Sequence, residues 1–154
     1  MINKYKLADY PQIKIVLNHD LFLSLECFRH HAKISCLQHT LEVAELTFKI
    51  TRRLGLDYVS ATRGALLHDF YLYDWHKDSP GLHGFKHPAI ALRNAKQVFD
   101  LNPVEENAIL RHMWPLTPLP PRYPESVIVS LADKTVSIRD YGYIFLKHPA
   151  FSMS

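Results

Sequence analysis

The chain has 154 residues, of which 47% are hydrophobic and 21% are charged, and its formal net charge is +3. This length predicts one domain with its own apolar core, and the composition is ordinary for a soluble globular protein. The small, scattered charge does not favour nucleic-acid binding, and no apolar run approaches the roughly 18 residues that a membrane span requires.

The chain has only two cysteines, Cys27 and Cys36, and they lack a C-x-x-C spacing. Neither a disulfide framework nor a thiolate metal site is therefore indicated. The first residues are not followed by the apolar core of a secretory signal, so we expect a reduced, cytoplasmic protein. Histidine, in contrast, is abundant, with ten residues in the chain. Histidine is the commonest metal ligand in proteins and transfers protons near neutral pH.

Residues 1–34 are predicted to form one or two short helices that precede the core, one of them capped by Asp20. His30-His31 follows in what we interpret as a loop. Two surface histidines are the favoured interpretation of this pair, and a His31 side chain that faces a functional site is the alternative.

Two helices are predicted between residues 35 and 69. Ser35 and Gln38 fit a capping box, and apolar residues at helical spacing continue to a C-cap at Gly55. His39 lies in the first turns of this helix, where a hydrogen-bonded core histidine is favoured over a metal ligand. Asp57 caps the next helix, which ends near the doublet His68-Asp69 after an apolar run. Burial of such a doublet costs several kcal/mol unless a charge or a metal satisfies it.

Aromatic residues follow the doublet. We interpret them as part of the apolar core in preference to a surface that stacks on a nucleobase. We expect a loop through residues 82–86, and then a helix with His87 as its N-cap and Pro88 at its first position. Another helix starts at Asn102-Pro103 and carries His112 near its end, with Arg111 facing solvent. Five prolines in residues 115–124 then predict a stiff irregular strap.

The last helix is predicted from Glu125 to about Asp140. Apolar residues cover nearly its whole circumference, which indicates a buried helix. Asp133 interrupts that run and should pair with a cation or a histidine. Residues 141–154 are interpreted as a loosely packed tail. No strand-like alternation of convincing length occurs, so the predicted fold is all-α.

The polar residues at helix ends or inside apolar helices form one set of four imidazoles and two carboxylates. This set suits iron, manganese, zinc or a similar divalent ion. It is too large for one catalytic ion with an open position, and it suits two ions that share a carboxylate. The set consists of His39, His68, Asp69, His87, His112 and Asp133.

The order H…HD…H…H…D resembles the HD-domain superfamily of metal-dependent phosphohydrolases. The local contexts of His68-Asp69 and His87-Pro88 resemble those of HD domains, and residues 108–112 and 130–134 resemble the corresponding segments of bacterial binuclear dinucleoside-tetraphosphate hydrolases. The resemblance covers roughly residues 35–140. It implies a single compact helical HD domain over residues 1–154, with N-terminal helices before the core and a short C-terminal tail after it.

The resemblance also implies roles for these residues. His39, His68, Asp69 and Asp133 would hold one ion, and Asp69 would bridge to a second ion. His87 and His112 would complete the second site, and a hydroxide between the ions would attack phosphorus. The implied cofactors are two divalent transition metal ions, with iron or manganese ahead of zinc, nickel or magnesium.

The implied substrate is a nucleotide or another small phosphoester, with no nucleic acid or membrane as a partner and a homodimer left open. Lys134 is predicted to act beside Asp69 in catalysis, and His83, Lys86 and Arg111 are predicted to neutralise phosphate charge. Two alternatives use the same residues. One is a mixed-valent di-iron oxygenase of the HD superfamily, and the other is a non-catalytic HD regulatory module.

Overall fold

The computed structural model describes residues 7–30, 34–74, 77 and 82–147. Within these ranges the secondary structure is helical, apart from one isolated β-bridge between Arg29 and Ser35, which confirms the all-α prediction. Its elements are α2 (Pro11–Leu17), α3 (Asp20–Leu23), the 3₁₀ helix η1 (Ser24–Cys27), α4 (Cys36–Arg53), α5 (Tyr58–Leu67), α7 (His83–Val98), α8 (Pro103–Arg111) and α9 (Pro124–Lys147).

Three of the predicted helix N-caps are confirmed, at Ser35, Asp57 and Asn102. Ser35, Asp57 and Asn102 each accept a hydrogen bond from the backbone N–H three residues later, at the starts of α4, α5 and α8. Asn102 and Glu105 form a complete capping box. After α4, Gly55 adopts a left-handed backbone with φ of 68°, which glycine tolerates without steric cost.

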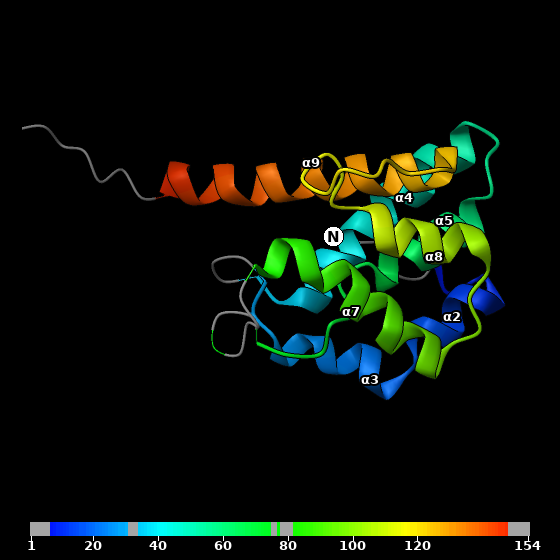
Figure 1. The fold of residues 1–154 in the computed structure, drawn as a ribbon, viewed down its shortest axis with the longest axis horizontal. Helices are drawn as coiled ribbons and strands as arrows, with labels where there is room; N and C mark the ends of the chain where they lie inside the picture. Colours follow the sequence, from blue (N-terminus) through cyan, green and yellow to red (C-terminus); the bar gives the residue numbers. More distant parts are fainter. Residues whose placement is uncertain (1–6, 31–33, 75–76, 78–81, 148–154) are drawn as a thin grey trace, which may run out of the picture.

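Four helices form the centre of the fold. Helices α4, α5 and α9 pack against one another, and α8 packs against α5 and α9. Helix α7 lies against α8, and α2 covers α5 (Figure 1). The buried apolar side chains come from all these elements, and they include Phe22, Val43, Leu66, Ile109 and Val129.

Helices α5 and α8 approach each other closely at Gly64. A Cβ atom placed on Gly64 would lie 2.7 Å from the Cβ atom of Ala108. Cβ atoms do not pack at that distance, so only glycine fits here without displacing α8. The two helices end close to this crossing, α5 at Leu67 and α8 at Arg111.

Two predicted helix starts are wrong. His87 is not an N-cap, because α7 begins one turn earlier, at His83, and Pro88 lies inside the helix. Proline removes only one backbone donor, and the helix continues through it here. In α3, His19 rather than Asp20 is the N-cap, and its Nδ1 atom accepts the Leu21 N–H at 3.2 Å.

The prediction for the last helix is wrong in two respects. Helix α9 continues to Lys147, because Gly142 weakens a helix without interrupting its hydrogen bonds. The helix is also not buried all round, since Leu131 is 52% exposed and Ile138 is 72% exposed. In Figure 1 its C-terminal part extends beyond the other described helices.

The proline-rich segment forms turns up to the start of α9, as predicted. None of the helices in the described ranges has the length and apolar character needed to cross a membrane. Of the residues discussed from the sequence, His31 and residues 148–154 lie outside the described ranges.

Candidate metal centre

Each residue of the predicted set is delivered by a helix or a helix end. His39 lies in the first turns of α4, His87 on α7 and Asp133 in the middle of α9. His68 and His112 are the C-cap residues of α5 and α8, and Asp69 follows the first of them. All of them are buried. The structure therefore brings together side chains that are far apart in the sequence.

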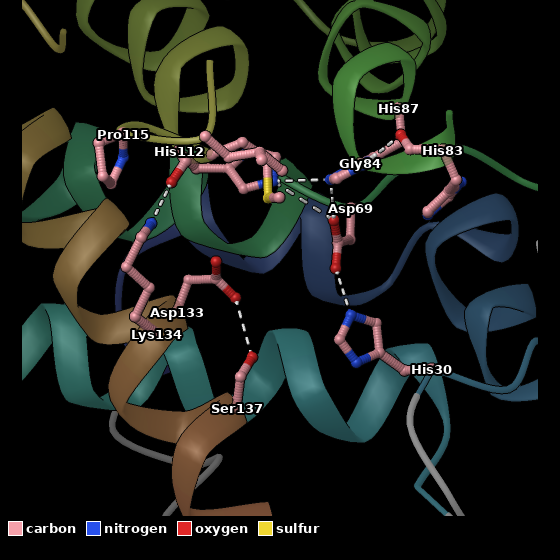
Figure 2. Close-up of a pocket in the computed structure, with 12 residues that line it drawn as sticks. His30, Asp69, His83, Gly84, His87, His112, Pro115, Asp133, Lys134 and Ser137 are labelled. Carbon is pink, nitrogen blue, oxygen red and sulfur yellow. Dashed lines mark hydrogen bonds and ion pairs between the residues drawn. The ribbon is translucent and has the colours of Figure 1, made fainter. Parts of the chain in front are cut away.

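Asp69 occupies the centre of the group, and its two oxygens face different histidines. Its Oδ1 atom is 3.1 Å from Nε2 of His87 and 3.6 Å from Nε2 of His112. Its Oδ2 atom lies on the other side, 3.4 Å from Nε2 of His68 and 4.0 Å from Nε2 of His39. Figure 2 shows Asp69 between His87 and His112 on one side and the α4 side of the pocket on the other.

A second carboxylate joins the two histidines on the Oδ2 side. The Oδ1 atom of Asp133 is 3.0 Å from Nε2 of His39 and 3.5 Å from Nε2 of His68. We call these three residues the Asp133 cluster, and we call the other two histidines the His87–His112 pair. Asp69 lies between the cluster and the pair.

The backbone fixes the tautomer of three of the histidines. Nδ1 of His68 is 2.6 Å from the Ala65 carbonyl oxygen, and Nδ1 of His112 is 2.7 Å from that of Ile109. Nδ1 of His87 is likewise 3.0 Å from a carbonyl oxygen, that of His83. Because a carbonyl oxygen only accepts, each Nδ1 must carry the proton. In a neutral ring the lone pair is then on Nε2, the atom that faces Asp69.

The Nε2 atoms of the His87–His112 pair face each other. The two Nε2 atoms are 2.8 Å apart. Burial, together with the charges of His68 and His87, lowers the pKa of His112 to about 3, so its ring is neutral at pH 7. Two lone pairs would repel each other at this distance, so either a proton or a cation lies between the two Nε2 atoms. Two nitrogens at about 2.1 Å from one ion, at a right angle, would be about 3 Å apart.

The Asp133 cluster is also suited to binding a cation. Within the described part of the chain, Nε2 of His68 is buried and makes no hydrogen bond. Burial would raise the pKa of Asp133, but the neighbouring imidazoles of His39 and His68 hold it well below its usual value. Burial would also raise the pKa of Asp69, but the neighbouring His68, His30 and His87 hold it well below its usual value. Two buried carboxylates close to several imidazole nitrogens form a set of ligands that fits divalent cations.

The comparison with protein families agrees with this geometry. The HD domain family model matches residues 36–137. The chain belongs to the HD-domain family. No curated protein and no solved structure matches it. The matched segment of the HD domain contains all six converging residues, and it leaves out the loop before α4.

In this HD domain a second carboxylate lies next to Nδ1 of His39, the ring nitrogen that faces away from Asp133. Nδ1 of His39 is 3.7 Å from Oδ2 of Asp140, which lies about two turns beyond Asp133 on α9. Burial alone would lower the pKa of His39, but the neighbouring carboxylates of Asp133 and Asp140 raise it to about 9. A carboxylate on the far nitrogen orients a histidine and increases its basicity, which strengthens it as a ligand. The sequence analysis did not identify Asp140.

A cavity of about 840 Å³ opens onto the centre. Asp69, His87, His112 and Asp133 form its polar end. Met113, Pro115 and Leu116, at the start of the proline-rich strap, give it an apolar wall. This volume is within the usual range for a small-molecule site.

The predicted phosphate-binding residues lie in different places. His83 lines the cavity, and its ring stacks on that of His87. Its Nδ1 atom forms a hydrogen bond of 2.9 Å with the Tyr73 hydroxyl. Lys86 is exposed and Arg111 is half-buried, and neither belongs to the described lining of the cavity. The structure therefore brings His83, but not the other two, to the centre.

Lys134 lines the cavity, but its ammonium group is engaged by the protein. Nζ donates to the His112 carbonyl at 2.8 Å, to Oγ of Ser130 at 2.9 Å and to the Ser130 carbonyl at 3.3 Å. An ammonium group has three N–H bonds, so a phosphate would have to displace one of these acceptors. Lys134 thus ties the end of α8, which carries His112, to α9 (Figure 2).

The sequence analysis was wrong about His30. The favoured interpretation was a surface residue, but His30 is only 7% exposed, and its Nε2 atom is 2.8 Å from Oδ2 of Asp69. Its ring stacks on that of His39, with ring centroids 3.8 Å apart. The only signal in the sequence was one more histidine shortly before the start of α4.

Proposed function

We propose that this HD domain is a binuclear metal-dependent phosphohydrolase that acts on a nucleotide or another small phosphoester. The observation that carries the proposal is the position of Asp69, whose Oδ1 faces the His87–His112 pair while its Oδ2 faces the Asp133 cluster. A carboxylate with different nitrogen ligands on each oxygen is suited to bridging two ions.

The residues of the centre would divide as follows. The Asp133 cluster and Oδ2 of Asp69 would hold one ion, and the His87–His112 pair and Oδ1 of Asp69 would hold the other. Imidazole and carboxylate ligands without thiolate suit iron or manganese, and they also accommodate zinc or nickel. A pair of such ions lowers the pKa of bound water and polarises a phosphoryl group, so no serine or cysteine nucleophile is needed.

The protein itself orients and encloses the substrate. The phosphoryl group would lie at the polar end of the cavity, beside Asp69 and the His87–His112 pair. The remainder of the substrate would contact the apolar wall of Met113, Pro115 and Leu116. His83, which is also in the lining, is placed to donate a hydrogen bond to a phosphate oxygen. These contacts support a small phosphoester with an apolar or aromatic part.

The test begins with metal analysis of protein purified without chelator, followed by phosphate release from a panel of phosphoesters with manganese and with iron. We expect two ions per chain and hydrolysis of at least one ester. Asp69→Asn removes the bridging charge with little change of shape, so it should abolish hydrolysis and leave a folded helical protein. Asp100→Asn, a change at an exposed aspartate outside the centre, is the matched control and should retain full activity.

Three results would contradict the proposal. Oxygen consumption by the iron-loaded protein, without phosphate release from any ester, would favour a di-iron oxygenase. Absence of bound transition metal would favour a non-catalytic HD module. Full hydrolytic activity in Asp69→Asn would mean that this carboxylate is not part of the reaction centre.

A further inference from the structure

The loop before α4 is fastened to the start of that helix. The backbone N–H of His30 donates to the Ile34 carbonyl at 3.0 Å, and that of Cys36 donates to the Phe28 carbonyl at 2.8 Å. Arg29 and Ser35 form the antiparallel bridge between these two bonds. Since Ser35 is also the N-cap of α4, the loop and the helix start are held as one unit.

This unit contacts Asp69 at two points. Nε2 of His30 is 2.8 Å from the side-chain Oδ2 atom of Asp69, and Sγ of Cys36 is 3.5 Å from its backbone oxygen. The ring of His30 is kept in place by its parallel stacking on His39, at an interplanar angle of 11°. In Figure 2, His30 points at Asp69 from the side opposite His87.

A hydrogen bond explains the contact with Asp69. A carboxylate oxygen only accepts hydrogen bonds, so Nε2 of His30 must be the donor. Each carboxylate oxygen has two lone-pair positions. Oδ2 can therefore accept this N–H while its other lone pair faces His68, 3.4 Å away. His30 and an ion in the Asp133 cluster do not compete for the same position.

We propose that His30 is a positioning residue of the metal centre, whose Nε2–H group fixes the orientation of the Asp69 carboxylate and thereby the sites of both ions. This inference rests on the proposed binuclear function. His30 lies outside the segment that the HD-domain model matches, and it is not one of the six converging residues. Groups that orient a metal ligand through a hydrogen bond change metal affinity by about 10–100-fold when they are removed.

The experiment compares three variants of the full chain. His30→Leu removes the donor. His30→Gln places a side-chain N–H near the former position of Nε2. Arg29→Ala changes the exposed neighbour in the same loop and is the matched control. Manganese affinity is measured by competition with a chromogenic chelator, and electron paramagnetic resonance reports whether two bound manganese ions are magnetically coupled through a bridge.

We expect His30→Leu to weaken the binding of both ions by about 10–100-fold and to reduce the signal of the coupled pair. His30→Gln should restore most of the affinity and the coupling, and Arg29→Ala should resemble the unchanged protein. Rescue by glutamine is a result that a loss of packing alone would not give. Circular dichroism of the metal-free variants checks that each is folded.

The inference is overturned if His30→Leu binds two coupled ions as tightly as the unchanged protein. It is also overturned if His30→Gln is as weak as His30→Leu, or if only one ion is affected, because either result would indicate direct ligation or packing by the imidazole ring. These outcomes leave the binuclear function intact. If the unchanged protein itself binds no ion pair, the proposed function fails first.

Discussion

The close approach of α5 and α8 gives the sharpest prediction about how the centre is built. Gly64→Ala would place a Cβ atom 2.7 Å from Cβ of Ala108. Ordinary contact between carbon atoms begins at about 3.5 Å, so the helices would have to separate by about 1 Å. Such overpacking typically costs about 1–3 kcal/mol, and the better helix propensity of alanine returns about 0.5–1 kcal/mol. We expect a net loss of about 1–2 kcal/mol.

The same separation of α5 and α8 would change the distances between residues of the candidate metal centre. The crossing lies one turn before His68-Asp69 on α5 and one turn before His112 on α8. Moving these helix ends apart lengthens the distance between Asp69 and His112, which is now 3.6 Å. We therefore expect Gly64→Ala to weaken the binding of an ion at the His87–His112 pair more than the binding of an ion at the Asp133 cluster.

A second substitution tests the cause. Ala108→Gly removes the atom that the new Cβ would meet, and the next neighbour, Cα of Glu105, is at an ordinary 3.6 Å. In the double variant the two changes should compensate each other by more than 1 kcal/mol. Urea unfolding followed by circular dichroism, in the presence of chelator, measures the four free energies. The reasoning is refuted if Gly64→Ala is as stable as the unchanged protein, or if the two changes add within about 0.5 kcal/mol.

Two further predictions concern the ligands. His87→Ala and His112→Ala should each leave about one tightly bound ion per chain in metal analysis, because they affect one side of Asp69; two retained ions would contradict this division. In the metal-free protein, His112 binds a proton more weakly in the folded state, where its pKa is about 3, than in the unfolded state, where its pKa is 6.5. The contribution of His112 to stability is therefore lost as the pH falls below 6.5. His39 binds a proton more strongly in the folded state, with a pKa of about 9, so its contribution is lost as pH rises from 6.5 through 9. Unfolding free energy of the metal-free protein should therefore be largest near pH 6.5, and His112→Phe should flatten the acid side of the curve; a maximum that lies well away from this pH would show that other groups dominate.

Local patterns were sufficient to predict much of the fold. The caps at Ser35, Asp57 and Asn102 depend on residues three positions apart, and the apolar spacing between them identified the helices. The convergence of the doublet with Asp133 could also be anticipated, since a carboxylate in an apolar helix needs a buried partner.

The errors come from interactions between distant segments. The burial of His30 depends on Asp69, which no local pattern near residue 30 indicates. The early start of α7 has no cap signal, because the side chain of Leu82 makes no capping hydrogen bond. The exposed residues of α9 could not be separated from the buried ones, since Leu131 and Val129 are both strongly apolar and the packing of α4, α5 and α8 decides which face is covered.

The carbonyl groups that hold His68, His87 and His112 would affect how the proposed centre binds and releases ions. Each ring is oriented by its own helix, through an oxygen three or four residues earlier, and so its tautomer is set before an ion arrives. Ion binding would then require neither an exchange of tautomers nor a change of the fold. The nitrogen ligands of the proposed ion pair are in this sense already oriented in the metal-free protein.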